Sequence, residues 1–225
     1  MEETELQNEL ASIRSIMERS SKFISLSGLS GILAGVYALI GAWVAYRTLG
    51  EDPTHLFVHI RSQVDAESNE PVRGLFYGGD YGIYTAVIGH LFIVAMLVLI
   101  ASVATAIILS NRQAKKKGQS MWGAVSRQLL FHMAVPLITG GILIGILLLH
   151  GHYGIISAAS LIFYGLALFG ASSFTFADVK YLGICEIILG LIAACLPGHG
   201  LLFWALGFGV LHIVYGARIY LKYDR

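Results

Sequence analysis

Long apolar stretches alternate with short polar connections along most of the chain. A membrane-spanning helix needs about 20 mostly apolar residues, and five stretches meet this requirement. A sixth stretch, 181–197, is shorter and contains Glu186. The pattern predicts an all-α polytopic membrane protein with one transmembrane domain, 23–220, made of six helices. The expected spans are about 23–46, 84–110, 129–150, 153–176, 181–197 and 199–220.

Charges in the connections predict how these helices are oriented. Segment 111–128 contains five basic residues and no acidic one (Arg112, Lys115, Lys116, Lys117 and Arg127). Because Lys and Arg are enriched in cytoplasmic connections, we expect 111–128 to be a basic cytoplasmic loop. Alternating from there places both termini and twelve of the 15 Lys and Arg residues inside, and leaves Arg47, Arg61 and Arg73 outside. This bias is lost if span 181–197 is omitted, so the sequence favours three in-out-in hairpins with cytoplasmic N- and C-termini.

The composition agrees with a membrane protein. Hydrophobic residues make up 56% of the chain and charged residues only 13%, whereas a soluble domain carries about 25% charged residues. The net charge of +1 disfavours nucleic-acid binding, which needs a basic face. The expected partner is therefore a lipid bilayer, at the plasma membrane, taken as a bacterial inner membrane.

Two segments are expected to lie outside the membrane. In 1–22, apolar residues recur with the 4-3-4 spacing of a short coiled-coil stripe, at Leu6, Leu10, Ile13 and Met17. We expect a cytoplasmic amphipathic helix that lies on the inner leaflet; the alternative is a handle for homodimerisation or for a protein partner. Segment 47–83 is predicted to be an acidic extracytoplasmic loop.

Small residues predict where helices pack closely. In lipid, association depends on close backbone approach, which small residues at a spacing of four allow. One such row is Ser27, Gly31 and Gly35, and a second is Gly141 and Gly145. The second span is instead a uniform run of Leu, Ile, Val and Ala, and we expect it to face lipid more than the others.

Glu186 is the most informative candidate site residue, because a carboxylate inside a membrane is costly unless it is paired, protonated or in a polar cavity. His132 and His212 are expected at a similar depth. Pro136 removes the amide that would bond the carbonyl of His132 and is expected to kink the helix there. The prediction is an intramembrane polar cluster of Glu186, His132 and His212 beside a kinked helix; the alternative is a structural carboxyl bonded to a neighbour.

Histidines on the outer side are candidates for a weaker metal site. Imidazole groups bind zinc or copper, and His55 and His59 share a face if 53–64 is helical. No carboxylate or cysteine completes a known ligand spacing, so no cofactor is predicted; a divalent metal and a haem between His132 and His212 stay as alternatives. The residues concerned are His55, His59, His150, His152 and His199.

Two classes of function remain open from the sequence. No enzyme motif such as GxSxG, HExxH or a phosphate-binding loop is present, so no catalytic activity is expected. The favoured class is a sensor, or an accessory or regulatory subunit of a membrane system, that docks through 1–22 and 111–128. The other class is a transporter or channel for an ion or small solute that uses Glu186, although one intramembrane acid is few for an ion-coupled transporter.

Overall fold

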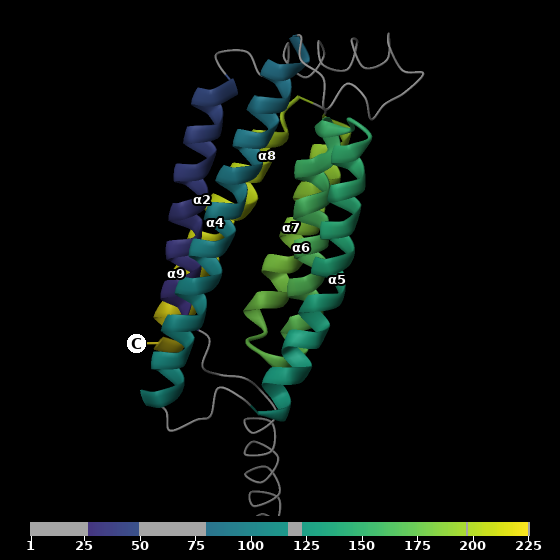
Figure 1. Ribbon diagram of the computed structural model, residues 1–225. Helices are drawn as coiled ribbons and strands as arrows, with labels where there is room; N and C mark the ends of the chain where they lie inside the picture. The colour runs from purple at the N-terminus through teal and green to yellow at the C-terminus, as the bar shows by residue number, and fades with distance from the viewer. Residues whose placement is uncertain (1–26, 50–79, 117–122, 197, 225) are drawn as a thin grey trace, which may run out of the picture.

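The computed structural model describes residues 27–49, 80–116, 123–196 and 198–224 (Figure 1). Every element in these ranges is helical, which confirms the all-α prediction. The last helix is built from four consecutive parts, and short 3-10 turns extend α6 at both ends. The elements are α2 (Gly28–Leu49), α4 (Asp80–Lys116), α5 (Ala124–Leu149), η1 (Tyr153–Ile155), α6 (Ile156–Ala171), η2 (Ser172–Phe174), α7 (Asp178–Cys195), α8 (Gly200–Trp204), η3 (Ala205–Leu211), α9 (His212–Ile219) and η4 (Tyr220–Asp224).

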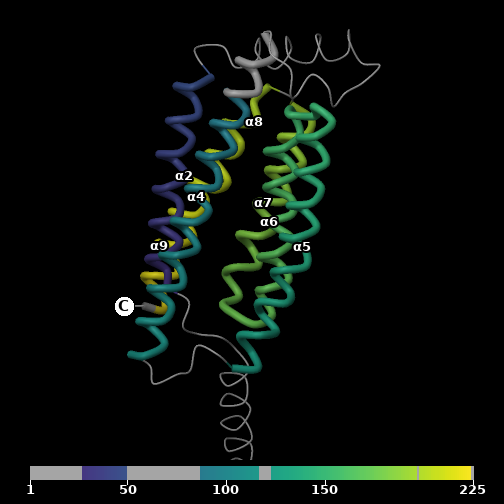
Figure 2. Tube along the Cα trace, viewed as in Figure 1, coloured from purple at the N-terminus to yellow at the C-terminus, as the bar shows by residue number. Residues whose placement is uncertain are grey.

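The helices form two groups that run side by side (Figures 1 and 2). In one group α2 packs against α4 and α9, and in the other α6 packs against α5 and α7. The last helix, α8 to η4, joins the groups because it contacts α2 as well as α6 and α7. Glu186 on α7 and His212 on α9 therefore belong to the elements along which the two groups meet.

Helices that follow one another in the chain are antiparallel, whereas α6 and the last helix run parallel. Contacts pair an early residue of one helix with a late residue of the next, as for Gly165 with Gly183 and for Ile162 with Gly190 between α6 and α7. The same holds for Gly41 and Val98 between α2 and α4. The last helix is antiparallel to both α2 and α7. The direction of the chain thus reverses at every connection, from α2 to the last helix.

Five helical segments are long and apolar enough to cross a membrane. Helix α7 is not one of them, because its 18 residues include Asp178, Lys180 and Glu186. It begins three residues before the predicted span 181–197, so Glu186 lies eight residues into the helix, or about 12 Å along its axis. The qualifying segments are Gly28–Leu49, Val87–Lys116, Ala124–Leu149, Tyr153–Phe174 and Gly200–Tyr223.

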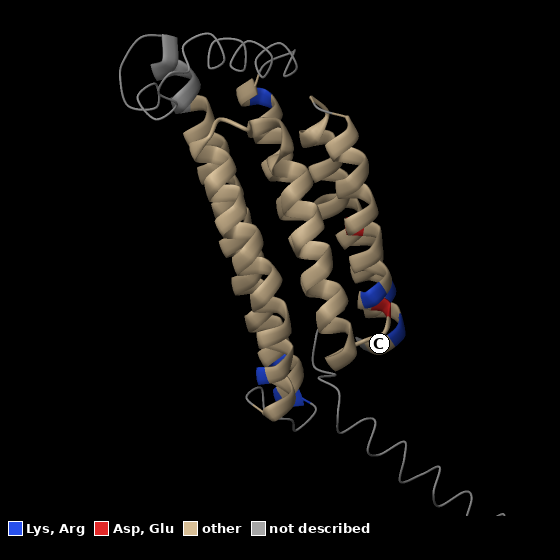
Figure 3. Ribbon diagram, turned by 90° about the vertical axis from the view of Figure 1, so that its right-hand side faces the viewer, with Lys and Arg blue, Asp and Glu red and all other residues tan. Residues whose placement is uncertain are grey.

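The two ends of the bundle differ in charge (Figure 3). Arg47 lies at one end, and the other described Lys and Arg residues lie at the opposite end, which we call the basic end. Helix α4 has no buried residue in its apolar window and contacts mainly α2, as expected for the most lipid-facing span. The basic end consists of Arg112, Lys115, Lys116, Arg127, Lys180, Arg218 and Lys222.

Glycines set the close packing of α2 against the last helix. A Cβ atom at Gly31 would lie 3.1 Å from the Cα of Gly216, and one at Gly35 would lie 2.6 Å from the carbonyl oxygen of Gly209. Gly28 also lies against this helix. Ser27 precedes α2, and its carbonyl accepts hydrogen bonds from the amide and the hydroxyl of Ser30.

The second predicted row of small residues behaves differently. A Cβ atom at Gly141 or Gly145 would meet nothing within 4 Å, so neither glycine contacts another described helix. Their neighbour Gly140 is the packing residue, since its Cβ would lie 2.5 Å from the Cβ of Phe163 on α6. The sequence pattern identified the right turn of α5 but the wrong side of the helix, because both sides carry glycine there.

Candidate functional site

Glu186 is completely buried, with an exposed fraction of 0%. Neither of its carboxyl oxygens has a hydrogen-bond partner among the residues that the structure describes. The nearest ionisable group is His212, whose Nδ1 lies 3.4 Å from Oε1 of Glu186. Buried polar groups are almost always hydrogen-bonded, so this carboxyl is exceptional and marks the candidate site.

Both ring nitrogens of His212 have a hydrogen-bond partner. Its Nδ1 lies 3.0 Å from the carbonyl oxygen of Gly207, and its Nε2 lies 2.8 Å from the hydroxyl of Tyr164. A carbonyl only accepts, so Nδ1 carries the hydrogen, and the hydroxyl of Tyr164 donates to Nε2 of the neutral ring. The Nδ1 hydrogen therefore faces two acceptors, the Gly207 carbonyl and the carboxyl of Glu186.

The last helix is π-helical where it passes Glu186. Segment η3 has the wide turn of a π-helix, an irregularity frequently found at functional sites. His212 follows Gly207 by five residues, so the wide turn brings its ring back over the carbonyl of Gly207. A Cβ atom at Gly207 would lie 2.5 Å from Oε2 of Glu186. Because glycine has no Cβ, the carboxyl of Glu186 can lie directly against the backbone of residue 207.

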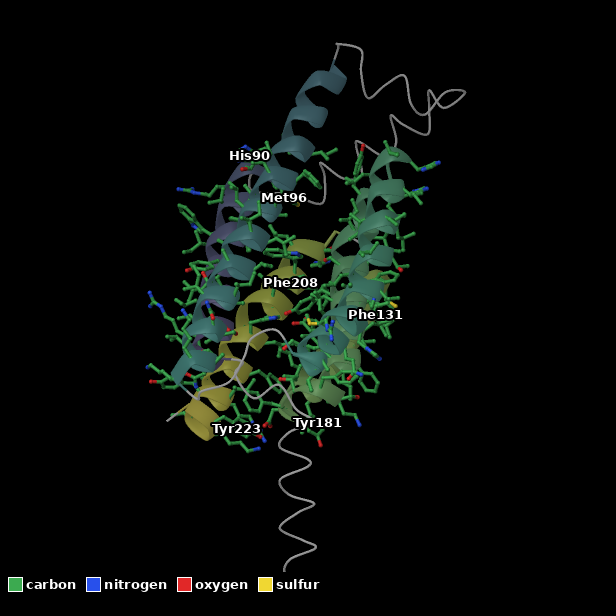
Figure 4. All side chains as sticks on the ribbon, turned by 60° about the horizontal axis from the view of Figure 1, so that its bottom comes forward. His90, Met96, Phe131, Tyr181, Phe208 and Tyr223 are labelled. Atoms are coloured by element: carbon green, nitrogen blue, oxygen red, sulfur yellow. The ribbon has the colours of Figure 1, made fainter. Side chains whose placement is uncertain are left out.

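Apolar clusters enclose the pair on both sides along the bundle. Toward the basic end lies a basic-side cluster, and toward the opposite end a far-side cluster, which Phe208 adjoins near the centre of the bundle (Figure 4). These clusters shield Glu186 and His212 from either end. The basic-side cluster is Leu168, Phe176, Val179, Leu182 and Ile219; the far-side cluster is Ala158, Leu161, Ala193 and Phe203.

The structure brings together only two of the three residues of the predicted polar cluster. His132 is exposed, donates from Nδ1 to the carbonyl of Gln128 at 3.0 Å, and lies 4.7 Å from the ring of Phe174. It is not a neighbour of Glu186, because α5 packs against α6 and η2, where His132 lies beside Gly170 and Phe174. Helix α5 also continues without a break past Pro136. The irregular helix beside Glu186 is therefore the last one and not the proline-containing one.

The remaining predicted histidines lie apart from this site. Nδ1 of His150 donates to the carbonyl of Ile146 at 2.8 Å, and His152 and His199 are exposed at the ends of neighbouring helices. His55 and His59 lie outside the described residues. Within the described ranges, no three His, Cys, Asp or Glu side chains are grouped as metal ligands.

A second polar cluster, which the sequence analysis missed, links α7 to the last helix at the basic end. The carboxyl of Asp178 is 3.0 Å from Nε of Arg218, and it accepts hydrogen bonds of 3.0 Å from Nζ of Lys222 and from the hydroxyl of Tyr223. Burial alone would raise the pKa of Asp178, but these hydrogen bonds and positive charges outweigh it and hold the pKa below its usual value. An acidic residue just before one predicted span and basic residues at the end of another were the available signal.

One further polar contact lies between the Glu186–His212 pair and the polar cluster around Asp178. The thiol of Cys185 is 3.7 Å from the hydroxyl of Tyr215. Tyr215 packs against the basic-side cluster and interacts electrostatically with Arg218 and Asp178. Polar groups on α7 and the last helix thus occur at three successive levels of the bundle.

The fold and site define an all-helical protein with five helices able to cross a membrane and a buried Glu–His pair. Comparison with protein-family models, with curated proteins and with solved structures gave no match.

Proposed function

We propose that the chain crosses the membrane six times and that its basic end faces the cytoplasm. Helix α7 connects the end of α6 to the start of α8, and these points lie at opposite ends of the bundle. If the five apolar segments cross the membrane, α7 has to cross it as well. Enrichment of Lys and Arg on the cytoplasmic side supports the orientation, with both termini inside.

We further propose that the protein is a non-catalytic, proton-responsive membrane protein: a sensor or regulatory subunit whose Glu186–His212 pair binds a proton. The observation that carries this proposal is the fully buried carboxyl of Glu186, which lacks a hydrogen-bond partner in the described structure and lies 3.4 Å from Nδ1 of His212. Such a group is costly as a carboxylate. Its protonation state is therefore strongly linked to the arrangement of the helices around it.

A proton suits this site better than a larger cation. Oε2 is so close to the backbone of Gly207 that even a methyl group there would clash. A metal ion needs several ligands at about 2 Å or more, whereas a proton needs only one carboxyl oxygen. The titratable side chains facing Glu186 are His212 from α9 and Tyr164 from α6.

Proton binding at Glu186 has a direct structural consequence in this geometry. A carboxylate attracts the Nδ1 hydrogen of His212 away from the carbonyl of Gly207, whereas a protonated carboxyl leaves this hydrogen bonded to the carbonyl. Gly207 is part of η3, so a change in the hydrogen bond to its carbonyl alters the π-helical turn. This turn packs against α2. A change at Glu186 is thereby transmitted to the helix that leads to the C-terminal end of the chain.

A proton-coupled carrier is the second candidate. It is favoured by the position of the Glu186–His212 pair on the elements that join the two helix groups, since transporters move two groups of helices around a site near the middle of the membrane. The two candidates differ in one respect. A carrier moves protons across the membrane, whereas a sensor only binds them.

The test is difference infrared spectroscopy of the purified protein in lipid nanodiscs, recorded across about pH 5 to 8. We expect a carboxylic-acid signal that Glu186→Gln removes and that Asp178→Asn retains, because the low pKa of Asp178 keeps it ionised in this range. The proposal fails if wild type gives no such signal or if Glu186→Gln keeps it. Proton flux through proteoliposomes that depends on Glu186 would select the carrier.

A further inference from the structure

Glu186 lies about midway along α7, so its distances to the two ends of the helix do not decide from which side a proton reaches it. Asp178 begins α7 eight residues before Glu186, and Cys195 ends it nine residues after. These separations correspond to about 12 Å and about 14 Å along the helix axis. The difference between the two routes must therefore come from the side chains that line them.

The route toward the basic end contains polar groups. Tyr215 packs against the basic-side cluster, and its hydroxyl lies 3.7 Å from the thiol of Cys185, the residue before Glu186 on α7. Tyr215 interacts electrostatically with Asp178 and Arg218 at the basic end. Asp178 also has three exposed or partly exposed partners, Arg218, Lys222 and Tyr223, so the route begins in contact with water.

The opposite route is apolar next to Glu186. The far-side cluster and the side chains packed on it, Leu189 and Phe208, contain no hydroxyl, thiol, carboxyl or imidazole group. The first hydroxyls on this side belong to Ser157 and Ser160, and Ser160 donates to the carbonyl of Ser157 at 2.8 Å. Hence no polar side chain of the described far-side cluster stands next to the carboxyl.

We propose that the Glu186–His212 pair exchanges protons only with the basic end, and that Tyr215 and Cys185 form the relay; this inference rests on the proton-binding role proposed above. Each relay group accepts one proton on its oxygen or sulfur lone pair as it releases its own, so its charge is unchanged overall. The carboxylate of Glu186 gains the proton and becomes neutral, and the solution at the basic end loses one. The groups that face the carboxyl are the side chains of Tyr164 and His212 and the backbone of Gly207.

The experiment uses full-length protein in proteoliposomes of one orientation, selected by affinity capture of a tag after Arg225. The pH is changed rapidly on one side with an impermeant buffer, and the infrared signal of Glu186 is followed in time. We expect the signal to respond to the basic side only. Tyr215→Phe should slow the response about tenfold or more, in line with typical contributions of a positioned proton donor, without moving the midpoint pH.

Tyr181→Phe is the matched control, because Tyr181 lies at the same end but is 58% exposed (Figure 4). A response to the opposite side, or equal rates in Tyr215→Phe and Tyr181→Phe, would overturn the relay. Both variants must unfold at the wild-type temperature; if Tyr215→Phe does not, Cys185→Ala takes its place with the same expectation. Complete absence of the Glu186 signal in wild type would instead refute the proton-binding function.

Discussion

Replacing Asp178 by asparagine is expected to weaken the contact between α7 and the last helix. The carboxyl of Asp178 is 3% exposed and bonds to Arg218, Lys222 and Tyr223. The side chain of Arg218 is 64% exposed, so its pair with Asp178 counts as a surface ion pair worth at most about 1 kcal/mol. The hydrogen bond from Tyr223 adds about 1 kcal/mol. Since asparagine keeps one acceptor oxygen, the expected loss is at most about 2 kcal/mol.

The pH dependence of this loss follows from the lowered pKa of Asp178. A carboxyl with a lower pKa in the folded than in the unfolded state stabilises the fold above the unfolded pKa, about 3.9. This contribution is lost as the pH falls through the folded value. The difference in unfolding free energy between wild type and Asp178→Asn should therefore be complete at neutral pH and shrink below about pH 4.

Reversible unfolding by a denaturing detergent, followed by circular dichroism in mixed micelles, measures this difference. Lys180→Gln is the control, because Lys180 lies at the same end over the ring of Phe169 and forms no ion pair with Asp178. It should change stability by less than about 0.5 kcal/mol. Equal stability of Asp178→Asn and wild type at pH 7, or a difference that does not decrease as the pH falls below about 4, would show that these ion pairs do not stabilise the contact between α7 and the last helix.

Two further predictions concern glycines. Gly35→Ala should destabilise the fold by about 1–3 kcal/mol, because its Cβ would lie 2.6 Å from the carbonyl oxygen of Gly209. Gly141→Ala is the control and should be neutral in the same unfolding assay, because its Cβ would meet no atom within 4 Å. Equal effects of the two substitutions would contradict the packing of α2 against the last helix. Gly207→Ala should push the carboxyl of Glu186 away from its place and shift the midpoint pH of its infrared signal. An unchanged midpoint in a folded protein would show that this glycine does not hold the carboxyl.

The helical architecture could be predicted because length and apolarity alone select membrane helices. Four of the six predicted spans agree with single apolar segments to within a few residues, and the second is longer, reaching Lys116. The shortest, 181–197, proved to be a helix that begins at Asp178. Its start was misplaced because apolarity, which guided the prediction, ends where the charged first turn begins.

The site could be predicted only in part, because depth in the membrane follows from the sequence but the direction of a side chain does not. Glu186 and His212 were expected at one level and they do meet, whereas His132 lies against Gly170 and Phe174 at the end of α6. Tyr164 could not have been found, because its role depends on how α6 packs against the last helix. The π-helical turn carries no local signal other than the glycines around Phe208.

The distribution of charged residues follows how much of each helix is enclosed by protein. Helix α4 has no buried residue in its apolar window and no charged residue between His90 and Ser110, because a charge facing lipid has no compensation. Helix α7 is packed against α6 on one side and the last helix on the other, and it carries Asp178 and Glu186 at buried positions. The two acidic residues of α7 thus lie on its buried face, whereas apolar side chains such as Ile188 and Leu191 occupy its exposed face. This buried face, between α6 and the last helix, is where a titratable group can act on its neighbours.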